Sequence, residues 1–194
     1  MRVGIDFRGA QSGGGSGQRG IGRYTLEMLK GILEFAPEVQ LVLFVKHDVE
    51  IPAELKGKCE IIPVVAASWS DAKKPLWLKI PKIRSIKRFH EMRFRSAVRK
   101  QKVAMEKALS STKLDVLHIP SALDIGSYPI YNYPCPVVMT FLDAIVIKLK
   151  HNTYDRYPWF LQTYYQEQGE NLKKADAIVA ISDASAKDAI EVFH

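Results

Sequence analysis

The sequence has few cysteines and no long apolar run. Cys59 and Cys135 form no CxxC pair and have no metal-ligand spacing, so they are typical of small buried residues in a reducing compartment. No stretch approaches the roughly 20 apolar residues that cross a bilayer. No signal-peptide core precedes the first strand pattern, which starts at Arg2. We therefore expect a cytoplasmic protein without a transmembrane helix.

Positive charge is concentrated in one part of the chain. The net charge is +7, but residues 73–107 contain thirteen Lys or Arg against Glu91 and Glu106, and the remainder is mildly acidic. Such a block indicates an anionic partner surface, although a solvated helix has the same composition. No nucleic-acid-binding motif accompanies the block, and we therefore expect no nucleic-acid partner.

Six short apolar runs predict the strands of a parallel α/β sheet. They show no polar–apolar alternation and are separated by helices or long crossings, as expected for strands buried on both faces. Pro63 indicates that the third strand is an edge or bulged strand. The sequence predicts one doubly wound, Rossmann-like domain. Its strand runs are 2–7, 40–46, 59–66, 115–120, 135–143 and 176–182, and its helical runs are 21–35, 84–109, 157–174 and 182–193.

A glycine-rich loop joins the first predicted strand to the first predicted helix. Glycines permit positive φ and let backbone N–H groups approach an anion at the helix N-terminus. Gly15, Gly17 and Gly20 match G-x-G-x-x-G, but the match begins only after six further residues beyond Arg8, whereas a dinucleotide fingerprint turns directly off its strand. We favour contact with phosphates over a surface linker, and dinucleotide binding is a weaker alternative. The loop reads Gly13, Gly14, Gly15, Ser16, Gly17, Gln18, Arg19, Gly20, Ile21, Gly22.

Four stretches, in order, resemble family 4 (group 1) glycosyltransferases. Asp6-Phe7-Arg8, followed by residues 19–27 (RGIGRYTLE), is similar to the first strand and "GIGRYT" helix start of that family. Residues 115–120 (DVLHIP) resemble its D-hydrophobic-hydrophobic-H-x-P strand. Residues 136–143 (PVVMTFLD) resemble P-V-V-x-T-x-H-D, and residues 175–188 resemble A-D-x-I-I-A-V-S-x-x-S-x-x-D. The resemblance spans the chain from end to end.

This resemblance implies a GT-B enzyme with two Rossmann-like domains and an active site in the cleft between them. Residues 1–194 would be the N-terminal, acceptor-side domain of a retaining glycosyltransferase. Such an enzyme moves a sugar from a nucleotide-sugar to a sugar, polysaccharide or lipid-linked acceptor. The donor-binding C-terminal domain is absent from this chain, so we expect the chain alone to be inactive. The resemblance implies no metal and no cofactor, because the nucleotide-sugar is a substrate.

The resemblance also implies roles for individual residues. Asp143 would be the catalytic residue near the transferred sugar, at the C-terminal end of a parallel strand where ligands collect. Leu142 replaces a family histidine that contacts this sugar, so another group takes its part, the substrate differs, or activity is weakened or lost. The cleft loop facing the donor diphosphate would be Gly13, Gly14, Gly15, Ser16, Gly17, Gly20 and Gly22. The acceptor or cleft lining would be Arg23, Tyr24, His118 and Leu142.

Several interpretations stay open at this point. Asp143 is equally suited to capping a loop or helix, and His118, inside a strand, fits a hydrogen-bonded structural histidine better than a catalyst. The aromatic residues of 154–165 fit core packing better than an acceptor pocket. Because family acceptors are often lipid-linked, Lys73–Lys107 would dock on the anionic inner face of a membrane, with the solvated helix as the alternative. The alternative function, favoured by Leu142, is a non-catalytic Rossmann module that binds a nucleotide or phosphorylated ligand.

Overall fold

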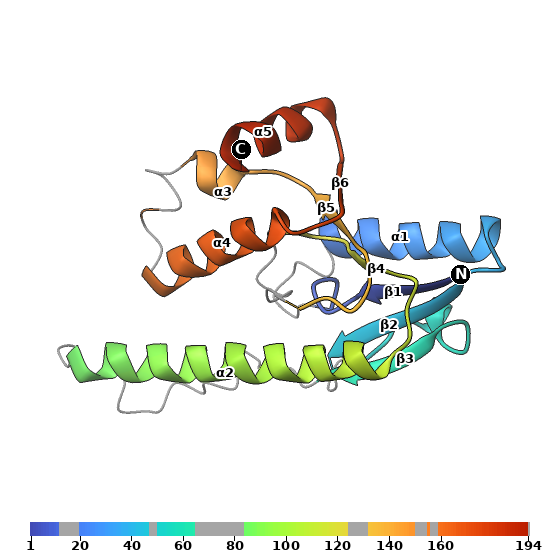
Figure 1. Ribbon diagram of the computed structural model, residues 1–194, viewed down its shortest axis with the longest axis horizontal. Coiled ribbons are helices and arrows are strands. Elements are labelled where there is room, and N and C mark those ends of the chain that lie inside the picture. The colour runs from blue at the N-terminus through green and yellow to red at the C-terminus, as the bar shows by residue number, and fades with distance from the viewer. Residues whose placement is uncertain are drawn as a thin grey trace.

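Six strands form one parallel sheet in the order β3-β2-β1-β4-β5-β6 (Figure 1). The computed structural model describes residues 1–11, 20–46, 50–64, 84–123, 132–149, 155 and 159–193. All five pairings between neighbouring strands are parallel. The expected doubly wound, Rossmann-like α/β fold is therefore confirmed. The strands are β1 (Arg2–Asp6), β2 (Gln40–Lys46), β3 (Glu60–Val64), β4 (Val116–Ile119), β5 (Val137–Phe141) and β6 (Ala177–Ala180).

Helices cover both faces of this sheet, and α1 and α2 lie on opposite sides of the strands (Figure 1). One core cluster lies under α1, through Leu29, Met28 and Ile32. The other core cluster includes residues of α2, α4 and α5, among them Met105 and Leu172. The helices are α1 (Gly20–Phe35), α2 (Arg84–Ser111), α3 (Ile145–Lys148), α4 (Trp159–Leu172) and α5 (Asp183–Phe193), and a 3-10 turn, η1, spans Ala53–Leu55.

The uninterrupted apolar run of β2 is explained by these two layers. Leu41, Leu43 and Val45 belong to the cluster under α1, and Val42 and Phe44 belong to the cluster on the opposite face. Because successive side chains point to opposite faces of a sheet, a strand covered on both sides needs apolar residues at every position. β3 lies at the sheet edge, as Pro63 predicted, because proline donates no hydrogen bond to a further strand.

The order of the strands places a topological switch point between β1 and β4. From β1 the chain proceeds outward through β2 to β3, and after α2 it returns to β4 and proceeds in the opposite direction through β5 to β6. Open α/β sheets bind ligands beyond the carboxyl ends of their strands at such a point. The segments that follow β1, β4, β5 and β6 are therefore the places to look for a site.

Each predicted strand and helix has a counterpart in the structure, with shifts of a few residues at the ends. Two short elements, η1 and α3, were not predicted, since three or four residues are too few for an apolar period to be recognised. Among the aromatic residues of 154–165, Tyr165 is buried, as expected for core packing. Tyr154 and Tyr157 lie outside the described residues.

A substitution at Gly4, in the middle of β1, tests how closely the sheet is packed. A Cβ at this position would lie 2.6 Å from Leu114 Cδ1 and 3.1 Å from Phe44 Cε2. We expect Gly4→Ala to lower the free energy of unfolding by about 1–3 kcal/mol, because the core must shift to admit the methyl group. Urea denaturation measures this change.

Gly31→Ala is the matched control, because a Cβ at Gly31 on α1 would meet nothing within 4 Å. Alanine is the better helix former by about 1 kcal/mol, so this variant should be more stable than the parent. A Gly4→Ala protein as stable as Gly31→Ala would contradict the close packing of β1.

Candidate functional site

A buried ion pair closes the turn after β1, next to the switch point. Arg8 Nε and Nη2 donate to Asp6 Oδ1 and Oδ2 at 2.8 and 2.7 Å, and the Arg8 backbone N–H donates to Oδ1 at 3.2 Å. Both side chains are 1% exposed. Removing one partner would leave the other charge buried without compensation. The pair therefore holds the direction in which the chain leaves β1 toward the glycine-rich loop.

Most of the glycine-rich loop lies outside the described residues, including Gly13, Gly14, Gly15, Ser16 and Gly17. Gly20 is the first residue of α1 and is exposed, and Gly22 is buried within the same helix.

The two described glycines of the loop are both helical. Positive φ therefore does not account for Gly20 or Gly22, and the approach of backbone N–H groups to an anion stays a prediction. Among the described residues, a Cβ at Gly20 would meet nothing within 4 Å. The packing of the described residues therefore does not require glycine at position 20.

Three polar side chains are linked beneath the first turns of α1. Thr140 on β5 is fully buried, and its Oγ1 lies 2.8 Å from His118 Nε2 and 3.2 Å from Tyr24 Oη. His118 and Thr140 alternate with residues of the α2-side cluster, which places both of them on the α1 face of the sheet. These bonds connect the helix that follows the glycine-rich loop to β4 and β5.

His118 is a neutral ring in this setting. Burial lowers the pKa of His118 from 6.5 to about 4, because desolvation disfavours the imidazolium ion. A neutral imidazole has one N–H donor and one acceptor nitrogen. Of the two, Nε2 forms the hydrogen bond with Thr140 Oγ1. The hydrogen-bonded histidine that the strand pattern favoured is present. A place for His118 in the lining of a ligand cleft stays a prediction.

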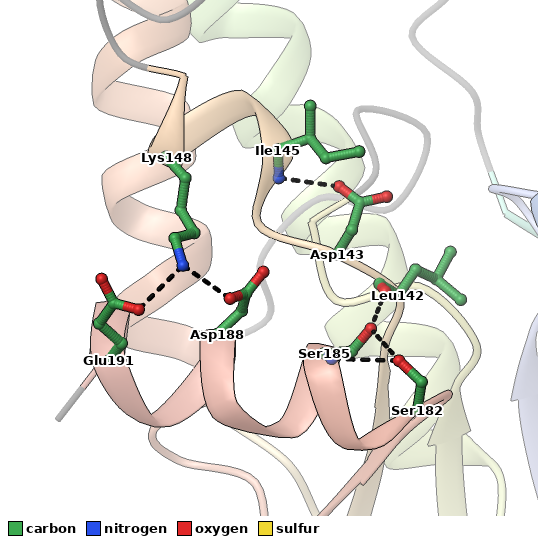
Figure 2. Close-up of polar contacts among 8 residues, drawn as sticks. All are labelled: Leu142, Asp143, Ile145, Lys148, Ser182, Ser185, Asp188 and Glu191. Carbon is green, nitrogen blue, oxygen red and sulfur yellow. Dashed lines mark hydrogen bonds and ion pairs between the residues drawn. The ribbon is translucent and has the colours of Figure 1, made fainter.

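Asp143 follows β5 and is exposed at the carboxyl edge of the sheet. Its Oδ1 accepts the backbone N–H of Ile145 at 3.0 Å, where α3 begins (Figure 2). Asp143 therefore caps the turn that leads into α3, whose N-cap residue is Ala144. This bond uses one of the two carboxylate oxygens, so a capping Asp143 can still present the other to a ligand, and the catalytic role stays a prediction.

Leu142 contributes its backbone to a cluster at the ends of β5 and β6. Ser185 Oγ donates to the Leu142 carbonyl oxygen at 2.7 Å, and Ser182 Oγ lies 3.1 Å from both the backbone N and the Oγ of Ser185 (Figure 2). Ser182 thereby caps α5, as its position before the last helix predicted.

The predicted site residues thus fall into two groups. Tyr24 and His118 meet through Thr140, whereas Leu142 and Asp143 belong to the cluster around α5. Arg23 is exposed on α1. Sequence reasoning did not single out Thr140 and Ser185 as site residues, and the only signal for them was their place within the matched stretches.

Within the part of the chain that is described, no group of three or more His, Cys, Asp or Glu could hold a metal ion. In that same part, none of the helices combines the length and the apolar character needed to cross a membrane. Comparison with protein-family models and with curated proteins found no match.

Protonation of His118 should destabilise the fold in mild acid. The folded-state pKa is about 4 and the unfolded value is near 6.5, so the unfolded chain binds the proton more readily between these pH values. The stability due to neutral His118 is complete above pH 6.5 and is lost as the pH falls toward 4. The total loss is about 3 kcal/mol.

The measurement is urea denaturation between pH 7 and 4.5 for the parent and for His118→Gln, which retains a polar group but does not titrate. Carboxylates titrate in both proteins, so the difference between the two pH profiles isolates the histidine. Parallel profiles would show that His118 does not have a lowered pKa.

Proposed function

We propose that this chain is the N-terminal, acceptor-side domain of a retaining GT-B glycosyltransferase resembling family 4 (group 1). The proposal rests on the position of the stretches that resemble this family. Asp6 ends β1 and Arg8 lies just beyond it, Leu142 and Asp143 follow β5, and Ser182 follows β6. All three positions are at the carboxyl edge of the parallel sheet, where open α/β folds bind their ligands.

The proposed reaction assigns a task to each part of this edge. The glycine-rich loop and the N-terminus of α1 approach the donor diphosphate, because backbone N–H groups and the helix dipole favour an anion. Asp143 stands near the transferred sugar, where a carboxylate stabilises positive charge that develops at the anomeric carbon. Arg23, Tyr24 and His118 line the acceptor side. The second domain of the enzyme holds the nucleotide-sugar, and no cofactor takes part.

A non-catalytic Rossmann module that binds a nucleotide or phosphorylated ligand is the second candidate. Leu142 favours it, because a leucine side chain cannot make the hydrogen bond of the family histidine. Sequence downstream of residue 194 discriminates between the two. A pair of glutamates with an upstream Arg and Lys would support transfer, and a polypeptide without them would support binding alone.

The direct test is an assay of the polypeptide that includes the downstream sequence, with a panel of nucleotide-sugar donors. Transfer to an acceptor with retained anomeric configuration is the expected result. The 194-residue chain alone should show the circular dichroism of a folded α/β protein and no transfer. Transfer by the 194-residue chain would mean that the active site has been misplaced.

Gly20→Val tests the diphosphate contact separately from the fold. The space around the missing Cβ is open, so the thermal midpoint should stay at or above that of the parent. A crowded diphosphate would cost a few kcal/mol of transition-state stabilisation, so kcat/KM in the two-domain enzyme should fall on the order of a hundredfold.

Gly31→Val is the control, because it places the same side chain on α1 in equally open space. It should leave turnover unchanged. If Gly20→Val stays within about twofold of the parent, the loop is a linker and the phosphate role is wrong.

We also propose that α2 docks on an anionic membrane surface. Its first turn has no acidic residue that would offset the positive end of the helix dipole. Anionic lipid headgroups would interact favourably with that end. In Figure 1 the N-terminal end of α2 extends away from the strands. One helical face combines exposed basic and apolar side chains, namely Met92, Arg99, Lys100, Val103 and Lys107.

Vesicle co-sedimentation tests this docking. The chain should bind vesicles containing phosphatidylserine and detach as the Debye length falls below about 8 Å with added salt. Reversing the charges of Arg99, Lys100 and Lys107 to Glu should abolish binding. The control reverses Lys58, Lys113 and Lys173, which are exposed outside α2 and change the net charge equally. Equal loss of vesicle binding in both variants would show that only net charge matters. If the parent does not bind vesicles, α2 is a solvated helix and the docking proposal is wrong.

A further inference from the structure

The segment from Leu142 to Lys148 is attached to helix α5 at both ends of the segment. At the first end, Ser185 Oγ donates to the Leu142 carbonyl oxygen at 2.7 Å. At the other end, Lys148 Nζ donates to Asp188 Oδ1 at 2.7 Å and to Glu191 Oε2 at 2.8 Å. Figure 2 shows Asp143 between these two attachments.

At the Leu142 end, the donor of each hydrogen bond is fixed because each serine hydroxyl group has only one proton. Ser185 has one hydroxyl proton, and it goes to the Leu142 carbonyl oxygen. The contact between the two hydroxyl groups therefore has Ser182 as its donor, while Ser182 Oγ accepts the Ser185 backbone N–H. One serine pair thus caps α5 and attaches that helix to the end of β5. Ser185 is 7% exposed, which protects these bonds from competition by water.

The attachment at the second end is ionic. Asp188 and Glu191 lie three residues apart on α5, on the same helical face, and both receive the Lys148 ammonium group. The hydrogen bond with Asp188, followed by that with Glu191, raises the pKa of Lys148 above 10.5, so the amine is charged at neutral pH. An exposed ion pair is worth little by itself, but here two carboxylates share one cation.

These polar contacts add to limited packing of α3. None of its four residues is fully buried: Val146 and Ile147 are half-buried, and Ile145 is 55% exposed. Buried Ala144 anchors the segment on the N-terminal side of α3. Asp143 itself is exposed and adjoins the attached carbonyl of Leu142, so the position of its carboxylate depends on where α5 holds the segment.

We propose that α5 sets the position of the Asp143 carboxylate, with Ser185 and Lys148 as the positioning residues. The functional part of this inference rests on the proposed role of Asp143 in sugar transfer. The attachment uses only the backbone carbonyl of residue 142. A leucine at this position therefore changes the side chain offered to a ligand without disturbing the hold on Asp143.

The first experiment measures amide hydrogen exchange at Ile145 by NMR in the 194-residue chain. The Ile145 N–H is the donor to Asp143, so its exchange rate reports the capped arrangement. Lys148→Met should accelerate this exchange roughly three- to tenfold, because the segment opens more readily without its ionic attachment to α5. Ser185→Ala should accelerate it as well, and Lys148→Arg should restore the parent rate.

The matched control is Lys30→Met, which removes an exposed ion pair with Glu27 on α1. Its Ile145 exchange rate should equal that of the parent. Lys148 is exposed enough that Lys148→Met leaves the core intact, so the test remains valid if Ser185→Ala fails to fold. An unchanged Ile145 rate in Lys148→Met would overturn the positioning by α5.

The second experiment uses the two-domain enzyme and separates this inference from the proposed function. Lys148→Met should lower kcat with little change in KM, and should cost nothing further in an Asp143→Asn background, since both changes act on one carboxylate. If Asp143→Asn leaves transfer unchanged, the catalytic role of Asp143 is wrong, whereas the exchange result stands on its own. If Lys148→Met accelerates exchange but leaves kcat unchanged, the positioning of a catalytic carboxylate is overturned.

Discussion

The burial of β1 between β2 and β4 is the constraint on which the rest of the structure depends. Val3 and Ile5 face the cluster under α1, and the close approach of Leu114 to Gly4 comes from the opposite side. A strand buried on both sides requires helices on both faces of the sheet. Because the chain leaves β1 in one direction and returns to β4 on its other side, the carboxyl ends of β1 and β4 lie at the topological switch point of the sheet.

At this edge, buried polar groups are paired with one another. Asp6 and Arg8 form a buried pair with matched geometry, and His118 is kept neutral beside Thr140. A charge or hydrogen-bonding group in such a place is costly unless its partner is already in position. The arrangement leaves Asp143 as an exposed carboxylate on a segment fixed at both ends, which is the kind of preorganised group that a transferase or a ligand-binding module requires.

The pattern of the sequence was sufficient for the sheet and its helices. Six apolar runs without alternation, and helical periods between them, predicted every strand and four helices, and Pro63 predicted the edge position of β3. The candidate site was predicted only in outline. Tyr24 and Thr140 are 116 residues apart, and Lys148 and Asp188 are 40 residues apart, so no local sequence pattern predicts these contacts.

What the sequence by itself determined is therefore local: which segments are strands, which are helices, and that a glycine-rich loop precedes the first helix. These properties follow from the period of apolar residues over a few turns. Only the tertiary structure decided that Gly20 begins a helix, that Asp143 accepts the backbone N–H of Ile145, and that α5 is hydrogen-bonded to the Leu142 carbonyl. The physical reason is that such contacts depend on which strands become neighbours, and that order is set by packing of the whole sheet.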